Sequence, residues 1–495
     1  MCGIMGVVSL GVLDHGFEYD QTVKDLQETW HRVADRGRDS WGFAYVGETH
    51  TVRFTSASDP DYERGWVRHT PYVGVGNRRG EPTTEWVQTK TDHDVQPFTS
   101  PSGRWVFTHN GTIANDKEIY ADSTVPAREW DVRPPTLIDS YAIGVMLDRE
   151  GWDAGIRKLV GSFAILAIDT KNPDRLYVAC NYKPLFLRSR RTHRGRVVQV
   201  ASQMRHLAHH YDPFLDPGIH EIPPYSIGWV TDREMEFGSL YGPSPNLERE
   251  KVLVICSGGL DSGTVAWLYH TRGLEVELVH FEYGARAQGP EVTAVEALAN
   301  AMQCQATFLT VDFFAHHAKS VLTNKDHGEI TKQRDGEAGA EFAHEWVPAR
   351  NTVFMALAMA YAEKHGHDVI AFGANMEEAG AYPDNEPEII NRFNALVPYA
   401  VKPYKRLRIE SPTANLVKHE IVREGLEHGM PFELTFSCYE AQAGRHCGTC
   451  GPCAMRKRAF AMNGTVDPVF SDACQRFHPS EKCEPGRNHP AAALS

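Results

Sequence analysis

Short apolar runs, separated by Gly, Asn and Pro, dominate the first 240 residues of the chain. Runs of this kind predict β-strands. They read GIMGVVSL, YVGVGNRR, GRWVFTHNG, GSFAILAID, RLYVACN and RVVQVASQ. Between them, QTVKDLQETWHRVA has the apolar spacing of a helix. The pattern predicts a sheet-rich α+β domain.

Beyond residue 250, strand-type runs alternate regularly with helical segments. The strand-type runs are KVLVICS, EVELVHFEY, ATFLTVD and DVIAFGAN, and the helical segments are SGTVAWLYHTRG, PEVTAVEALANAMQ and RNTVFMALAMAYAEKHG. Such alternation favours a parallel sheet with helices on both faces. The polar segment YGPSPNLEREK (241–251) separates the two patterns. We therefore expect domains at 1–240 and 250–475, followed by a flexible tail at 476–495.

Composition narrows the class of protein. A chain of 495 residues is too long for one ordinary core, which agrees with two domains. The formal net charge of −13 argues against broad attachment to nucleic acid. There is no apolar run of about eighteen residues and no cleavable export signal at the start, so we expect a cytoplasmic protein. The ten cysteines give no disulfide framework, and four of them cluster in sequence.

The sharpest local motif follows directly on the strand-type run at 251. It consists of Ser257, Gly258, Gly259, Leu260, Asp261 and Ser262. Glycines let a backbone close around phosphates, and serine hydroxyls and the amides of a helix N-terminus donate hydrogen bonds to anionic oxygens. Asp261 would cap the helix or help to hold Mg²⁺. Ordinary strand-to-helix turns use the same residue types, but the order of all six resembles the SGGxDS pyrophosphatase (PP) loop of ATP-dependent adenylating ligases. The resemblance implies transfer of AMP to a substrate oxygen.

The clustered cysteines have the spacing of a metal site. They are Cys438, Cys447, Cys450 and Cys453. Four thiolates complete the tetrahedral coordination of one Zn²⁺ and leave no position open, so such a metal is structural. An iron–sulfur cluster is the rival interpretation, because CxxCxxC spacing also occurs there.

Residues 251–470 resemble the 7-cyano-7-deazaguanine synthase family. The matching segments are SGGLDS, FEYGARAQGPE, VPARN (347–351), GANMEEAGAYPDNEPEIINRFN (373–394), VKHEIVREGLEHGMPFELTFSCYE (417–440) and the cysteine cluster. The resemblance implies an adenine nucleotide alpha hydrolase-like, doubly wound α/β domain with a zinc subdomain. It places Ser257–Ser262, Arg350 and Asn351 at ATP, and it places Asn375, Glu377, Tyr382 and Asp384 in a deazaguanine pocket. Tyr382-Pro383-Asp384 alone is typical of a turn. The chain departs from the family's pattern at Ala285, Ala287 and Asn385.

The first domain resembles class II glutamine amidotransferases, which are N-terminal-nucleophile (Ntn) hydrolases with an αββα sandwich. The matching segments are MCGIMGVV, ADRGRDSWGFA (34–44), GNRRGEPT (76–83), FTHNGTIAN (107–115), LIDSYA (137–142), VGSFAILAID (160–169) and NYKPLFL (181–187). A cysteine at an arbitrary position is usually a buried hydrophobe. Removal of Met1 would instead give Cys2 a free α-amine, and a thiol needs such a base.

The resemblance assigns roles in glutamine hydrolysis. Cys2 would attack the side-chain amide of glutamine, and Asn110 with the Gly111 amide would form the oxyanion hole. An Asn-Gly pair alone is also the commonest hairpin signal. Arg79 or Arg78 would bind the α-carboxylate of glutamine, because a guanidinium pairs with it through two hydrogen bonds. Asp139 would bind the α-ammonium. Asn77 stands where this family commonly has His, which leaves the choice of arginine open.

Together the two domains imply an enzyme that uses L-glutamine and Mg²⁺–ATP to aminate a 7-deazaguanine. One interpretation is synthesis of the 7-cyano base from the 7-carboxy base through an adenylate and an amide. The alternative follows from archaeosine-type fusion proteins, which add ammonia to the nitrile, in the free base or in tRNA or DNA, to give a formamidine. A nitrile has no oxygen to adenylate, and the acidic charge favours a free base. An asparagine synthetase-like ligase has the same domain order, and a homodimer stays open.

Overall fold

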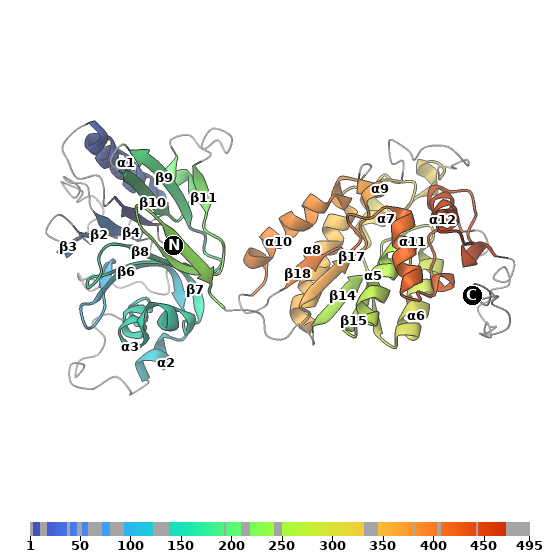
Figure 1. Cartoon of the computed structure of the whole chain (residues 1–495), viewed down its shortest axis with the longest axis horizontal. Coiled ribbons are helices and arrows are strands. Elements are labelled where there is room, and N and C mark those ends of the chain that lie inside the picture. The colour runs from blue at the N-terminus through green and yellow to red at the C-terminus, as the bar shows by residue number, and fades with distance from the viewer. Residues whose placement is uncertain are drawn as a thin grey trace, which may run out of the picture. The chain divides into compact units, whose positions relative to one another are not determined.

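The computed structural model describes residues 3–9, 17–36, 40–46, 52–57, 72–79, 94–121, 138–192, 195–208, 218–241, 250–330, 345–379, 382–402, 407–441 and 444–471. Cys2, most of the expected linker and the expected tail lie outside these ranges. The chain divides into two units, Met1–Ser244 and Pro245–Ser495, and each is described by itself (Figure 1).

The first unit contains two antiparallel sheets. In spatial order, the larger sheet has β11 (Ile219–Glu221), β9 (Phe186–Thr192), β10 (Gly195–Ala201), β1 (Gly3–Val8), β4 (Val73–Arg79), β2 (Ser40–Val46) and β3 (Val52–Ala57). The smaller sheet has β13 (Met235–Ser239), β12 (Ser226–Val230), β8 (Leu176–Cys180), β7 (Gly161–Asp169), β6 (Trp105–Ile113) and β5 (Phe98–Thr99). The helices are α1 (Phe17–Val33), α2 (Asp116–Ala121), α3 (Tyr141–Arg157) and α4 (Met204–Leu207). The predicted sheet-rich α+β organisation is confirmed.

Strand alternation divides the core of this unit into layers. On β1, Ile4 and Val8 pack against residues of the smaller sheet, whereas Met5 and Val7 pack against α1. Helix α3 covers the other face of the smaller sheet through a separate cluster that includes Phe107. The layers therefore run helix, sheet, sheet, helix, with α1 and α3 on opposite sides (Figure 1).

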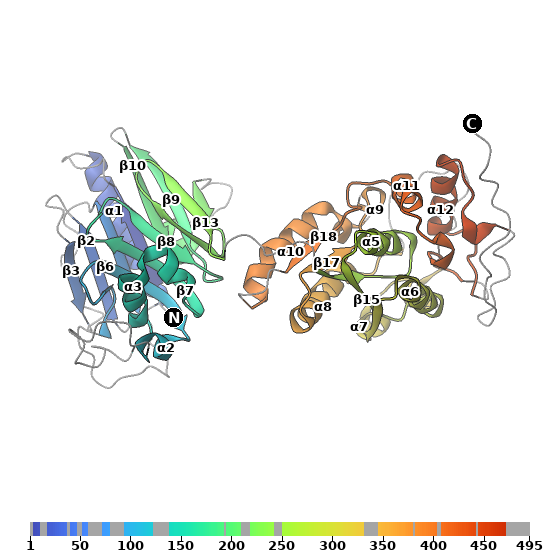
Figure 2. The same cartoon turned by 60° about the horizontal axis from the view of Figure 1, so that its bottom comes forward.

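The second unit is built on a five-stranded parallel sheet. Its spatial order is β16 (Gln305–Thr310), β15 (Glu275–Glu282), β14 (Lys251–Ile255), β17 (Val369–Phe372) and β18 (Arg408–Glu410). Its helices are α5 (Leu260–Thr271), α6 (Gln288–Met302), α7 (Phe313–His317), α8 (Arg350–His365), α9 (Met376–Ala379), α10 (Pro387–Ala400), α11 (Lys418–Glu427) and α12 (Gly451–Met462). Alternate residues of β14 enter two core clusters, one containing α5 and the other α8, so both faces are covered (Figure 2). The predicted parallel sheet is confirmed.

The strand order defines where a ligand can bind. The chain runs outward from β14 through β15 to β16 and then returns to β17 on the other side of β14. In open parallel sheets of this kind, the connections after the two strands at the reversal separate and leave a crevice at their carboxyl ends. These connections are the SGGLDS loop and the segment beginning at Gly373.

A buried polar cluster connects β15, β16 and the segment that precedes β17 near the amino ends of these strands. The Glu277 carboxylate accepts hydrogen bonds from Tyr361 Oη (2.6 Å), His367 Nε2 (3.0 Å) and Thr307 Oγ1 (3.2 Å). Burial lowers the pKa of His367, although the neighbouring carboxylate opposes this shift. This Glu277 cluster lies at the opposite end of the sheet from the SGGLDS loop. Within the described part of the chain, every helix is too short or too polar to span a membrane.

Candidate active sites

The SGGLDS loop closes tightly between β14 and α5. The Ser257 N–H donates to Ser262 Oγ (3.1 Å), and the Gly259 N–H donates to Ser257 Oγ (3.3 Å). Gly258 has φ 77°, and a Cβ there would lie 2.7 Å from the carbonyl oxygen of Glu291. Only glycine fits this position. The loop therefore presents backbone N–H groups and hydroxyls at the start of a helix, as the sequence predicts.

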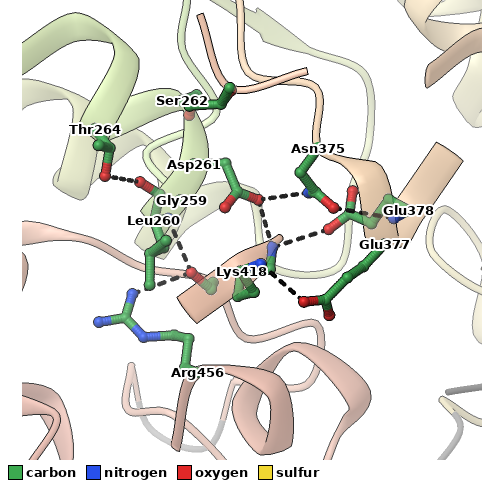
Figure 3. A network of polar contacts seen from close by, with 12 residues as sticks. Gly259, Leu260, Asp261, Ser262, Thr264, Asn375, Glu377, Glu378, Lys418 and Arg456 are labelled. Carbon is green, nitrogen blue, oxygen red and sulfur yellow. Dashed lines mark hydrogen bonds and ion pairs between the residues drawn. The ribbon is translucent and has the colours of Figure 1, made fainter. Parts of the chain in front are cut away.

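A buried lysine connects the loop to the segment that follows β17. Lys418 Nζ donates to Asp261 Oδ2 and to Glu378 Oε1, the latter at 3.0 Å (Figure 3). Asn375 Nδ2 also donates to Asp261 Oδ2, at 3.2 Å. The Lys418 side chain is only 9% exposed. Burial raises the pKa of Asp261, and the Lys418 ammonium opposes this shift.

Sequence reasoning singled out Asp261 and Asn375 but missed Lys418 and Glu378. Glu377, which it did single out, accepts the Lys418 N–H through Oε1 at 2.8 Å and so binds the N-terminus of α11 (Figure 3). Its neighbour Glu378 lines the cavity beside the loop. The signal for Lys418 was weak, because a lysine at the start of a helix is ordinarily exposed.

A cavity of about 160 Å³ opens at the carboxyl ends of the strands. Six of the predicted ATP-site residues line it: Ser257, Gly259, Asp261, Ser262, Arg350 and Asn351. A smaller cavity shares Arg350 and Asn351 with it and also contains Tyr382 and Asp384. The structure thus brings the two predicted groups of residues to adjoining cavities. Gly258, Leu260, Asn375 and Glu377 are not lining residues of either.

The smaller cavity has aromatic and acidic walls. Tyr382 stacks on Trp346 with ring centroids 5.9 Å apart and an interplanar angle of 26°. Asp384 Oδ2 accepts the Asn351 N–H at 2.9 Å, which orients this carboxylate at the start of α8. Arg350 Nη1 donates to the Tyr283 hydroxyl at 3.2 Å. A flat base with N–H groups suits such a combination of aromatic rings and carboxylates.

The four predicted cysteines come together. Their Sγ atoms all lie within 4.8 Å of one another, and three of the four residues are buried. Tetrahedral Zn–S bonds of about 2.3 Å would place sulfurs about 3.8 Å apart, so the set fits one ion. Backbone N–H groups also point at the sulfurs: Cys447 N donates to Cys438 Sγ (3.2 Å) and Cys450 N to Cys447 Sγ (3.3 Å). Such donors stabilise thiolates.

The cysteine segment also holds the SGGLDS loop. Ser437, next to Cys438, accepts the Leu260 N–H through Oγ at 3.1 Å, and the Phe436 N–H donates to the Gly258 carbonyl at 2.7 Å. Arg456 of α12 donates to Ser437 Oγ at 3.1 Å and forms a buried ion pair with Asp467. Figure 3 shows Arg456 directed towards the start of α5. The position of the cysteine cluster and the position of the loop are therefore mechanically coupled.

In the first unit, Asn110 and Gly111 are consecutive residues of β6. Gly111 has φ 151°, and a Cβ there would lie 1.9 Å from the Ser162 carbonyl oxygen, so only glycine fits. The Asp139 carboxylate accepts the Ser140 N–H (2.7 Å) and the Ile113 N–H, which fixes it beside the end of β6. The structure therefore brings these three predicted residues into one region.

Buried His109 supports the same region. Its Nε2 lies 3.2 Å from the Ser162 carbonyl, and its Nδ1 lies 2.8 Å from Ser140 Oγ. A carbonyl can only accept, so Nε2 carries the hydrogen and Nδ1 accepts from Ser140. Burial lowers the pKa of His109, which keeps the ring neutral. Sequence reasoning missed this residue.

Arg78 and Arg79 point to opposite faces of β4. Arg78 lies on the α1 side, with its guanidinium 4.9 Å from the centre of a Trp30 ring, and burial lowers its pKa to about 10. Arg79 shares the face of Val75, which packs between the two sheets. Asn77, on that same face, donates to the His109 carbonyl at 3.4 Å. Alternation therefore puts Arg79, and not Arg78, on the face of β4 that turns towards β6.

Comparisons with known proteins match both units. The family model "Glutamine amidotransferase domain" matches residues 84–209, and "Queuosine biosynthesis protein QueC" matches residues 251–464. The chain is thus a fusion of a glutamine amidotransferase domain with a QueC domain.

Curated relatives extend over the whole chain. A protein of Saccharolobus solfataricus named 7-cyano-7-deazaguanine synthase is 40% identical over 95% of this chain and all of its own length. One of Sulfurisphaera tokodaii, named 7-cyano-7-deazaguanine synthase 2, is 40% identical over 95% of this chain and 99% of its own length. The chain belongs to the 7-cyano-7-deazaguanine synthase family. A synthase of Methanothrix thermoacetophila is 38% identical over 44% of this chain and 97% of its own length, so relatives with one domain share the name.

Proposed function

We propose that the chain makes 7-cyano-7-deazaguanine from the 7-carboxy base, with ATP as activator and glutamine as nitrogen donor. One observation carries this proposal. Lys418 and Asn375 join the SGGLDS loop, through Asp261, to the segment that contains Glu378, Tyr382 and Asp384. A loop suited to phosphates and a pocket suited to a base thus adjoin at the switch point of a parallel sheet.

The reaction removes two oxygens and adds one nitrogen. ATP adenylates the carboxylate with loss of pyrophosphate, and ammonia displaces AMP to give the amide. A second ATP adenylates the amide oxygen, and loss of AMP gives the nitrile. Each oxygen leaves on one AMP, so one nitrile requires two ATP. Arg350, Asn351 and the loop N–H groups would bind the nucleotide, and Mg²⁺ would neutralise its phosphates.

The first unit would supply the ammonia. Cys2 directly precedes Gly3, the first residue of β1, which pairs with Arg78 on β4. With Met1 removed, the α-amine would take the thiol proton as sulfur attacks the glutamine amide, and water would clear the thioester. Asn110 and Gly111 would stabilise the oxyanion, Asp139 would bind the α-ammonium, and Arg79 the α-carboxylate. The helix–sheet–sheet–helix layering supports an Ntn-hydrolase sandwich, and the loop supports a PP-loop fold.

The cysteine cluster would hold structural Zn²⁺. All four positions of a tetrahedral ion are filled by protein sulfurs, so the metal would take no substrate. Its role would be to fix Ser437 and α12 against the SGGLDS loop. Metal analysis separates zinc from an iron–sulfur cluster.

Product analysis tests the function. The purified chain is incubated with glutamine, Mg²⁺–ATP and the 7-carboxy base, and mass spectrometry follows the amide, the nitrile and AMP. We expect two AMP per nitrile, and we expect Cys2→Ala to abolish activity with glutamine but keep activity with ammonium. Formation of a formamidine from the 7-cyano base without ATP, and no AMP from the acid, would overturn the proposal.

A further inference from the structure

Glu291 is a carboxylic acid that faces the larger cavity beside the nucleotide loop. It lies in the first turn of α6, and its carbonyl oxygen would be 2.7 Å from a Cβ at Gly258. Glu291 lines the cavity together with Asp261 and Arg350. Within the described residues, no hydrogen bond or ion pair holds its carboxylate. A carboxyl group in a cavity without a protein partner is available to a ligand.

The other acidic groups of the cavity are already engaged. Asp261 and Glu378 both bind the Lys418 ammonium. Protonation of either carboxylate would break its ion pair with Lys418 and leave that buried ammonium with one partner fewer, so neither group is free to act as a base, although burial raises the pKa of Asp261. Glu291 differs from both, since it has no such partner.

The remaining ionisable groups are poorly suited to take a proton. Arg350 is cationic, burial raises the pKa of the Cys256 thiol to about 11, and burial also raises the pKa values of Tyr283 and Tyr439. His280 Nδ1 donates to the Cys256 carbonyl at 2.9 Å, and burial lowers the pKa of the ring, which makes Nε2 a weak base. For Glu291, burial raises the pKa to about 7, and the charge of Arg350 opposes this shift. A base with a pKa near the operating pH transfers protons most effectively.

The proposed reaction needs such a base. Once the amide oxygen carries AMP, the nitrogen must lose its hydrogens as protons before a C≡N bond can form. In the last step, the electron pair of the N–H bond becomes the third carbon–nitrogen bond. The electron pair of the C–O bond leaves on AMP.

We propose that Glu291 is the general base of nitrile formation, its carboxylate accepting the N–H proton as AMP leaves and then passing it to water. The inference rests on the proposed function. It assigns a catalytic residue to the second half of the reaction, the conversion of amide to nitrile.

The test starts from the 7-carboxamide with Mg²⁺–ATP, so that neither glutamine nor ammonia takes part. Glu291→Gln and Glu291→Asp are compared with Glu296→Gln, since Glu296 is an exposed residue of the same helix. In the wild type, we expect kcat to rise with pH with an apparent pKa of about 7. We expect Glu291→Gln to lower kcat by about 10²- to 10⁴-fold and to abolish this rise. Glu291→Asp should keep the rise at a lower rate, and Glu296→Gln should match the wild type.

Two further measurements keep the outcomes distinct. ATP–pyrophosphate exchange with the 7-carboxy base breaks no N–H bond, so Glu291→Gln should retain it together with the wild-type KM for ATP. Loss of exchange, or a raised KM with unchanged kcat, would show that Glu291 binds nucleotide and would overturn the inference. If kcat of Glu291→Gln still rises with pH as in the wild type, the inference is also overturned, and His280 becomes the candidate base. Failure of the wild type to convert the amide would instead refute the proposed function.

Discussion

Replacing Lys418 by methionine removes the only cation bound to both Asp261 and Glu378 among the described residues. Methionine keeps similar volume, so the change acts on charge more than on packing. Removing one partner of a buried ion pair costs about 3–5 kcal/mol, because the other charge stays buried. At about 1.4 kcal/mol per factor of ten, the opening equilibrium of this unit should increase by about two to three and a half orders of magnitude.

Hydrogen–deuterium exchange measures the opening equilibrium of each unit separately. Peptides from β14 and α5 should exchange faster in the variant, whereas peptides from β7 in the other unit should not change. Arg392→Met is the matched control, since Arg392 pairs with Glu388 at 76% and 59% exposure. A pair as exposed as this contributes little to stability, because water and salt screen it.

The stability lost in the Lys418→Met variant should depend on pH in a defined direction. Without Lys418, the folded-state pKa of Glu378 rises, and that of Asp261, which burial already raises, rises further, so both lie above their unfolded values. The penalty is therefore present above the folded-state pKa values and shrinks as the pH falls and the carboxyl groups become neutral. The variant's deficit should be smaller at pH 5 than at pH 8. A change below tenfold in β14 and α5, or a deficit that grows with acid, would refute the reasoning.

Four other variants or conditions test further features. Asn110→Ala removes the side-chain donor of the proposed oxyanion hole and should lower glutamine-dependent activity about 100-fold or more, while ammonium-dependent activity stays unchanged in the same product assay. Arg79→Lys should raise the KM for glutamine more than Arg78→Lys does, and the reverse order would contradict the facing of β4. Cys450→Ser should lower the metal content measured by elemental analysis, and full metal content would count against the cluster. Burial lowers the pKa values of His206, His280 and His367, so on acidification the unfolded chain binds protons before the folded chain does. The melting temperature should therefore decrease once the pH is below about 6.5. A constant melting temperature between about pH 7.5 and pH 5.5 would contradict this.

Hydrophobic patterning predicted β1, β4, β6, β7, β8, β10 and β14 to β17, because each of these strands lies in a short apolar run bounded by turn residues. It did not predict β2, β3, β5, β9, β11, β12, β13 or β18, most of which are shorter or more polar. It could not choose between Arg78 and Arg79. Both faces of β4 are buried, one by α1 and the other by the smaller sheet, so the apolar and polar sides do not alternate in the sequence. Helices α10, α11 and α12 were not predicted, although motif resemblance singled out their segments.

The predicted site was most complete where function depends on contiguous residues. The SGGLDS loop and the cysteine cluster are local motifs, so their chemistry can be recognised from spacing. Lys418 and Asp261 are 157 residues apart, and only the fold reveals that the lysine is buried between two carboxylates. Glu291 was missed for the same reason, since an acidic residue in the first turn of a helix is ordinarily a solvated N-terminal charge.

The Glu277 cluster gives the second unit a separate place for adaptation. It ties the amino ends of the strands, whereas the SGGLDS loop and both cavities lie at their carboxyl ends. Substitutions around Tyr361 or His367 can therefore alter the temperature at which the sheet melts without displacing a residue that lines either cavity. Adaptation to a hotter or colder habitat can therefore change the thermal stability of this unit through residues at the amino ends of the strands, while the residues at the carboxyl ends stay the same.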